Sequence, residues 1–179
     1  MKTKLHYVLT IAMLLFVFSS FSQNSTWKKV ESIKTSENLS KFQLDNTKAH
    51  IFELDLTSFK KNTASATLRG FSNKQTNTVI SIPAINGKME TFKIYEISVF
   101  APELAAKYPN IKSYVGVSTK HSGTNLRMSV SPQGVQTMIS SVGNPTVFMQ
   151  PIAKGSNKYV VYKKGDKNVS KDKFECKTL

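Results

Sequence analysis

The stretch VISIPAINGKMETFKIYEISVF, residues 79–100, decides the fold class of this chain. Val79 to Pro83 is a short apolar run, and Met89 to Phe100 is a longer run of the aromatic and β-branched residues that strands favour. Asn86-Gly87 between them is a strong turn signal, because both residue types accept the positive φ angles that tight hairpin turns require. The stretch therefore predicts a β-hairpin and, with it, an antiparallel sheet.

Further strand signals lie on both sides of this hairpin. They are apolar or alternating runs at residues 51–56, 112–118, 126–130, 135–140, 146–149 and 158–163. A turn at 132–134 separates two of them, and residues 57–67 predict a short helix that starts from a Thr or Ser cap. A spacing of about 8 to 12 residues between turns is typical of antiparallel β domains. We expect a mostly β (α+β) fold, an antiparallel sheet or sandwich-like domain with one or two short helices.

The first 22 residues have the composition of a secretory signal peptide. Lys2 and Lys4 precede the apolar run Tyr7 to Phe18, and Ser20-Phe21-Ser22 supplies small residues before a cleavage point at Gln23. The apolar run is shorter than the roughly 20 residues that span a bilayer, although an uncleaved membrane anchor is the alternative. The predicted product is secreted or periplasmic, without a membrane segment after cleavage.

Four segments follow from composition. They are the signal peptide at 1–22, a polar lead-in at 23–47, a β-rich domain at 48–164 and a charged tail at 165–179. The lead-in contains Trp27, the single tryptophan of the chain, and we expect it to dock on the domain.

The basic excess of the chain limits the class of partner. Without the 22-residue leader, 23 basic and 11 acidic side chains remain, a net charge of +12. The lysines are scattered, and arginine occurs only at Arg69 and Arg127. Arginine is the residue that recognises phosphate and guanine through bidentate hydrogen bonds. Nucleic-acid binding is therefore not expected. A solvated basic surface or an acidic protein partner fits the charge better.

Cys176 is the single cysteine of the chain, so no internal disulfide can form. Its thiol is incidental, pairs with another chain or is a metal ligand.

The segment PELAAKYP, residues 102–109, predicts a two-turn helix. Pro102 suits the first turn, where its missing N–H costs nothing, and Pro109 ends the helix. Glu103 lies at the N-terminal end and Lys107 at the C-terminal end, as the helix dipole favours. Leu104 and Tyr108 fall on one helical face, which we expect to pack on the sheet. A direct role at the surface of a partner is the alternative.

The strand predicted at 112–118 follows at once. Tyr114 is expected to be buried there, and Gly116 is expected to form a corner together with the two prolines.

No catalytic motif is present. His50 and His121 are far apart in sequence and belong to no HExxH or paired CxxC pattern, and GxSxG, P-loop and GxGxxG motifs are absent. The acidic residues are dispersed and suggest no acid–base pair. We expect no enzyme activity and no cofactor. A small hydrolase whose site is assembled from distant segments is an alternative.

Three segments together resemble the N-terminal propeptide of secreted, reprolysin-like zinc metalloproteases of the kind common in Bacteroidota. They lie at residues 79–116, 127–139 and 147–164, and the pairing of PELAAKYP with IKSYVG is the most specific of them. In that family the propeptide precedes a catalytic domain with HExxHxxGxxH, which this chain lacks. The resemblance implies a propeptide-like domain that assists folding of a partner metalloprotease and inhibits it. Zinc is then expected only in the partner.

The resemblance also implies a role for Cys176. In such propeptides a cysteine near the C-terminal end fills the open position of the catalytic zinc with a thiolate. Cys176 lies at that end of the chain, although Lys177 stands where the family has glycine. Two alternatives to the propeptide reading are a secreted binding or adhesin-type module and a truncated gene fragment without a partner.

Overall fold

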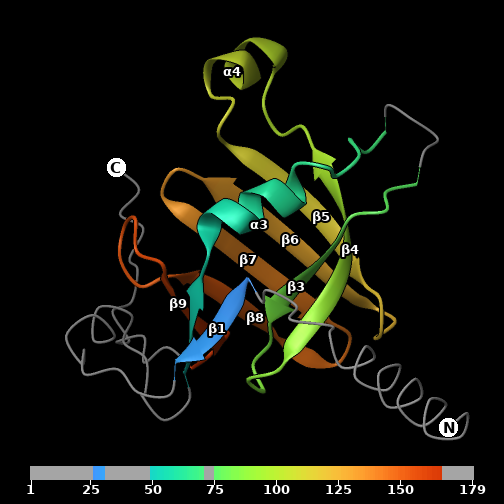
Figure 1. The fold of residues 1–179 in the computed structure, drawn as a ribbon. Helices are drawn as coiled ribbons and strands as arrows, with labels where there is room; N and C mark the ends of the chain where they lie inside the picture. The colour runs from blue at the N-terminus through green and yellow to red at the C-terminus, as the bar shows by residue number, and fades with distance from the viewer. Residues whose placement is uncertain (1–25, 31–48, 71–74, 167–179) are drawn as a thin grey trace, which may run out of the picture.

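The computed structural model describes residues 26–30, 49–70 and 75–166, which form nine strands and two short helices (Figure 1). The strands are β1 Trp27–Val30, β2 His50–Leu54, β3 Val79–Pro83, β4 Met89–Ile97, β5 Lys112–Ser118, β6 Thr124–Ser131, β7 Gly134–Ser141, β8 Asn144–Pro151 and β9 Lys158–Lys163. The helices are α3 Leu56–Thr63 and α4 Pro102–Lys107. The predicted mostly β, antiparallel fold with one or two short helices is confirmed.

All nine strands belong to one antiparallel sheet, in the order β1-β2-β9-β8-β7-β6-β5-β4-β3. From β3 to β9 each strand pairs with the next along the chain, as short hairpin turns allow. β2 pairs instead with β9, with Ile51 opposite Val160, so the N-terminal strands extend the C-terminal side of this meander. The sheet curls until β1 lies beside β3, which makes it a nearly closed barrel (Figure 1).

Trp27 joins the two edges of the curled sheet. Its indole is 4% exposed, and Nε1 donates a hydrogen bond to the carbonyl oxygen of Ser81 in β3 at 2.8 Å. The ring meets Phe59 of α3 and Tyr159 of β9 edge to face, with centroids 5.8 Å and 5.3 Å apart. One side chain therefore connects both edges, the helix and the C-terminal strand.

Strand alternation fills the barrel interior with side chains. The interior cluster has the fully buried residues Ile82, Phe92, Ile94, Val135, Tyr159 and Val161 at its centre. Tyr159 shows how tightly this core is packed: its hydroxyl accepts a hydrogen bond from the Val135 amide at 3.2 Å, and burial raises the pKa of the phenol. Gly134 passes directly over that hydroxyl with φ of 125°, and a Cβ there would lie 2.8 Å from the Tyr159 oxygen.

Helix α3 lies across the concave side of the sheet (Figure 1). It begins at Leu56 because Asp55 caps it: the carboxylate accepts from the Ser58 amide at 3.1 Å and from the Ser58 hydroxyl at 2.6 Å, and these bonds lower the pKa of Asp55. The predicted Thr or Ser cap was wrong, and the helix is shorter than the predicted 57–67. Phe59, 1% exposed, is the residue that ties α3 into the interior cluster.

The polar lead-in at 23–47 contains a strand that the sequence did not predict. Trp27 does dock on the domain, yet it does so as the first residue of β1, a true strand paired with Leu54 of β2. The sheet therefore begins before residue 48. The strand has the sequence WKKV, and only its tryptophan is buried. It therefore lacks the alternation of apolar and polar residues from which a strand is predicted.

Trp27→Ala is expected to lower the free energy of unfolding by about 3–5 kcal/mol, since it leaves a cavity where the indole packs between the two edges of the sheet. Trp27→Phe keeps a ring but leaves the Ser81 carbonyl without its donor, at a cost of about 1–3 kcal/mol. Urea unfolding followed by circular dichroism measures both changes. Val142→Ala, at a side chain that is 83% exposed, is the control and should stay within about 0.5 kcal/mol of wild type. An unchanged unfolding midpoint for Trp27→Ala would show that the contacts of Trp27 between the two sheet edges do not stabilise the barrel.

Candidate functional site

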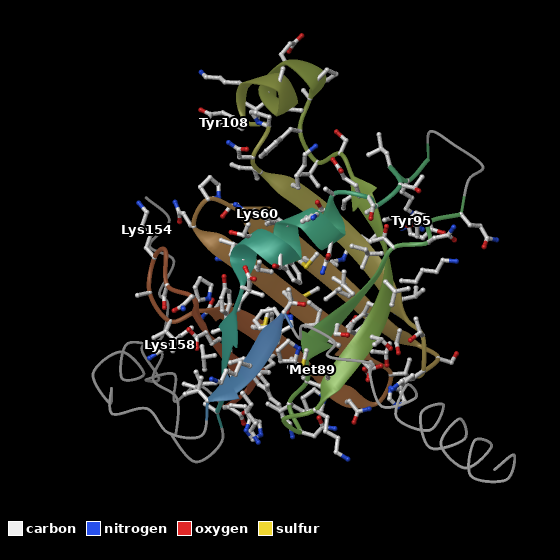
Figure 2. The ribbon with its side chains drawn as sticks, viewed as in Figure 1. Lys60, Met89, Tyr95, Tyr108, Lys154 and Lys158 are labelled. Carbon is white, nitrogen blue, oxygen red and sulfur yellow. The ribbon has the colours of Figure 1, made fainter. Side chains whose placement is uncertain are left out.

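Helix α4 projects from the barrel instead of packing on it (Figures 1 and 2). None of its residues is buried, and Leu104 and Tyr108 are 42% and 44% exposed. Val99, which precedes the helix, is 59% exposed. The prediction that Leu104 and Tyr108 pack on the sheet was therefore wrong. The pattern is that of an amphipathic helix, but its apolar face points to solvent.

Local bonds hold the shape of this projection. Pro102 occupies the first helical position, and the Tyr108 amide closes the helix on the Leu104 carbonyl at 3.0 Å just before Pro109. Within the described residues Glu103 and Lys107 form no ion pair; Lys107 Nζ instead lies 5.8 Å from the centroid of the Tyr108 ring. The predicted helix thus forms with Pro102 at its first position and the Tyr108–Leu104 backbone bond at its end, without a side-chain cap at Ala101.

The base of the projection is closed by an ion pair between β4 and β5. Lys112 Nζ lies 2.7 Å from Glu96 Oε1, and the hydrogen bond that Lys112 donates to this carboxylate raises the pKa of Lys112. Because both side chains are partly exposed to solvent, we expect the ion pair to add little to the free energy of unfolding. Its main effect is to fix the position of the two side chains relative to each other.

Of the predictions for Tyr114 and Gly116 in β5, the first is confirmed and the second is wrong. Tyr114 is 3% exposed, as predicted, and its burial raises the pKa of the phenol while a hydrogen bond with Thr63 of α3 opposes the rise. Gly116 is not a corner: it lies inside β5 opposite Ile94. A Cβ at Gly116 would lie 3.0 Å from Ile94 Cγ2 and 3.2 Å from the Lys93 carbonyl oxygen, so a larger residue would have to displace these neighbours by a few tenths of an ångström.

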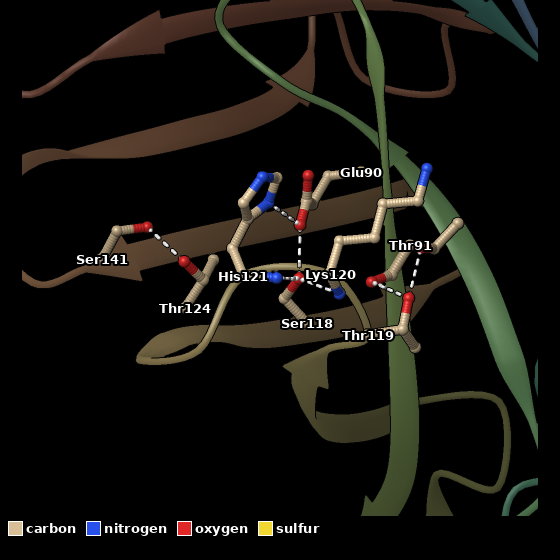
Figure 3. Close-up of polar contacts among 8 residues, drawn as sticks. All are labelled: Glu90, Thr91, Ser118, Thr119, Lys120, His121, Thr124 and Ser141. Atoms are coloured by element: carbon tan, nitrogen blue, oxygen red, sulfur yellow. Dashed lines mark hydrogen bonds and ion pairs between the residues drawn. The ribbon is translucent and has the colours of Figure 1, made fainter.

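A second polar group lies where β4 meets the turn after β5 (Figure 3). The Ser118 hydroxyl donates to Glu90 Oε1 in a short bond, and His121 Nδ1 lies 2.7 Å from the same oxygen. The Ser118 oxygen also accepts from the amides of Lys120 and His121, at 3.1 Å and 2.9 Å. Partial burial alone would raise the pKa of Glu90, but the bonds from Ser118 and His121 outweigh it and lower that pKa below its ordinary 4.5.

This arrangement differs from a nucleophilic triad in its connections. In a triad the serine donates to the imidazole, which removes its proton. Here the carboxylate is central, and Ser118 is bonded to Glu90 and to two backbone amides. The bonds orient His121, 66% exposed, with Nε2 facing away from Glu90. A histidine held by a carboxylate is common at metal sites, yet the described residues contain no group of three or more His, Cys, Asp and Glu side chains that could hold a metal.

A cavity of about 370 Å³ borders this group at one end of the barrel. It lies among three hairpin turns and has both apolar and polar walls, including Ala84, Ile85, Glu90, His121, Ser122, Val142, Asn144 and Lys163. Sequence reasoning placed His121 in a polar turn but missed its contact with Glu90, which lies 31 residues earlier. Only the register of β4 against β5 brings the two together.

The remaining predicted features lie partly beyond the described residues. Cys176, the signal peptide at 1–22 and most of the tail at 165–179 fall outside them. His50 is the first residue of β2 and is half-buried. No helix in the described ranges has the length and apolar character needed to cross a membrane.

Comparison of the chain with protein-family models, with curated proteins and with solved structures finds no match. The likeness to metalloprotease propeptides therefore rests on the three sequence segments themselves.

Glu90→Gln is expected to make the free energy of unfolding less dependent on pH in the acidic range. Because the folded state lowers the pKa of Glu90 below 4.5, its ionised form stabilises the fold above that pH, and the contribution is lost as pH falls through the folded pKa. The unfolding free energies of wild type and Glu90→Gln should differ most near neutral pH and converge as the pH falls through the folded pKa of Glu90, as urea titrations at several pH values would show.

Glu103→Gln on α4 is the matched control, because Glu103 has no bonded partner among the described residues. It should follow wild type at every pH. A difference between Glu90→Gln and wild type that stays constant throughout the acidic range would contradict the assigned role of the ionised carboxylate.

Proposed function

We propose that this chain is a secreted, propeptide-like domain that assists folding of a partner zinc metalloprotease and inhibits it, with no catalysis of its own. The observation that carries the proposal is the projection of α4, whose Leu104 and Tyr108 are exposed although their spacing is that of a packed helical face. Exposed aromatic and aliphatic side chains on a rigid element are typical anchors of protein interfaces. The sequence resemblance supplies the class of partner.

The position of α4 supports such a contact. The helix stands clear of the barrel on the connection between β4 and β5, so a partner can approach it without disturbing the sheet (Figure 1). A short amphipathic helix that enters a hydrophobic groove is a common recognition mode. Burial of Leu104 and Tyr108 in a partner's groove would contribute about 1 kcal/mol for each side chain, because each is already more than half covered.

Cys176 adds a second contact within the same proposal. Its thiolate would occupy the open coordination position of the partner's catalytic zinc and displace the water that the enzyme needs. Binding through α4 would then hold the domain in place while the thiolate blocks the zinc. A secreted binding module with a different partner would use α4 in the same way but would have no effect on proteolysis.

The double variant Leu104→Ser/Tyr108→Ser is expected to weaken inhibition of a purified reprolysin-like metalloprotease at least about tenfold, because it removes both apolar anchors. Hydrolysis of a fluorogenic peptide at increasing concentrations of the secreted chain measures the inhibition constant. The melting temperature of the variant should match wild type, since neither side chain is buried. Val142→Ser, at an exposed turn residue outside α4, is the control and should inhibit like wild type.

Cys176→Ser separates the two contacts. If the thiolate binds the zinc, this variant should still form a complex in gel filtration but should leave the protease more active. Failure of the wild-type chain either to inhibit the metalloprotease or to form a complex with it would reject the proposed function and favour the binding module.

A further inference from the structure

The two arginines of the chain, far apart in sequence, line the same hollow on the outer face of the sheet. The hollow has a volume of about 490 Å³. Arg69 and Arg127 line it together with the amides Gln75 and Asn125 and with Tyr95, which Figure 2 labels on β4. Sequence reasoning noted both arginines but had no reason to place them together.

Backbone pairing positions the two arginines on opposite sides of the hollow. On one side, the Arg69 amide donates to the Glu96 carbonyl at 2.9 Å and the Glu96 amide to the Thr67 carbonyl at 3.0 Å, which fixes the short segment 67–69 beside β4. On the other side, Arg127 projects from β6. Three strand spacings of about 4.8 Å separate the two backbones, a distance of about 14 Å.

The floor between them is largely apolar. The register places Tyr95 opposite Val115 and Val115 opposite Arg127, so these three side chains form one row across β4, β5 and β6. Val117, 51% exposed, and Leu68 complete the apolar lining.

Among the described residues, no acid forms an ion pair with either guanidinium group. The lining contains no Asp or Glu, and the ion pairs of the described residues are Lys112–Glu96 and His121–Glu90. A third cation lies close by, because Lys93 Nζ donates to Gln75 Oε1 at 3.4 Å. The hollow therefore has a positive potential, and its guanidinium groups have free donors for a carboxylate.

We propose that this hollow binds an acidic peptide segment in which two carboxylates flank an apolar side chain. In an extended peptide, side chains at i, i+2 and i+4 share one face and span about 14 Å, close to the spacing between segment 67–69 and β6. Arg69 lies level with Ile97, two residues along the strand from the row of Tyr95 and Arg127, and its long side chain can span this offset of about 7 Å. The outer carboxylates pair with the two arginines and the central apolar residue covers Val115. A phosphate chain has no apolar group for this floor, and a sulfated sugar has only the C–H faces of its ring. The site needs no protease partner and is therefore independent of the proposed function.

Titration of the isotope-labelled, secreted chain with the acetylated peptide Glu-Ser-Val-Ser-Glu, followed by NMR, tests the proposal. The largest shifts are expected at Val115, Val117 and Asn125. Arg69→Gln/Arg127→Gln should raise Kd at least about tenfold, because charge-assisted hydrogen bonds are lost. Both arginines are exposed, so the spectrum of the free variant should keep the dispersion of the folded chain.

Lys154→Gln/Lys158→Gln is the charge-matched control: it also removes two positive charges, but from exposed residues that do not line the hollow (Figure 2). Its Kd should stay within about twofold of wild type, whereas equal losses in both double variants would mean general charge attraction and overturn the site.

Two further ligands test the chemistry. The peptide Gln-Ser-Val-Ser-Gln should not bind, and Glu-Ser-Ser-Ser-Glu should bind more weakly than the valine peptide. If a heparin-derived disaccharide binds the hollow more tightly than the valine peptide, or if the serine peptide binds equally well, the site is a general anion site and the proposal fails.

Discussion

The burial of the Trp27 indole between the two edges of the sheet is the contact on which the rest of the barrel depends. A curled sheet with open edges exposes unpaired backbone groups and leaves its interior open to water. The indole closes this gap by bonding to Ser81 in β3 while its ring packs on Phe59 and Tyr159. Since Trp27 and Ser81 are 54 residues apart, the contact forms only when the meander and the N-terminal strand are both in place.

A barrel closed in this way packs its interior with fully buried side chains such as Phe92, Ile94 and Val161. The features that carry our two proposals lie on the outside of the described barrel. The projecting α4 offers exposed apolar side chains, and the hollow between Arg69 and Arg127 offers positive charge. An acidic peptide would meet complementary charge in the hollow, and complementary potentials speed encounter.

Sequence reasoning succeeded where the signal was local. The boundaries of β3, β5 and β9 were predicted to the residue, because alternation and turn chemistry act within a few positions. The helix at Pro102–Lys107 was also predicted, but its packing was not. An amphipathic pattern predicts that a helix has an apolar face. It does not tell whether that face packs on the same chain or stays exposed. Trp27 was recognised as an anchor, while the strand that carries it was missed.

Local patterns in the chain thus account for its strands, its turns and its antiparallel fold class, since each depends on neighbouring residues. The assembled sheet alone decides the rest. It pairs β2 with β9, holds α4 away from the body, and brings His121 to Glu90 and Arg69 to the same hollow as Arg127. These meetings depend on strand register and on the curl of the whole sheet. Both are sums over many weak pairings across the chain, so no short stretch of sequence contains them.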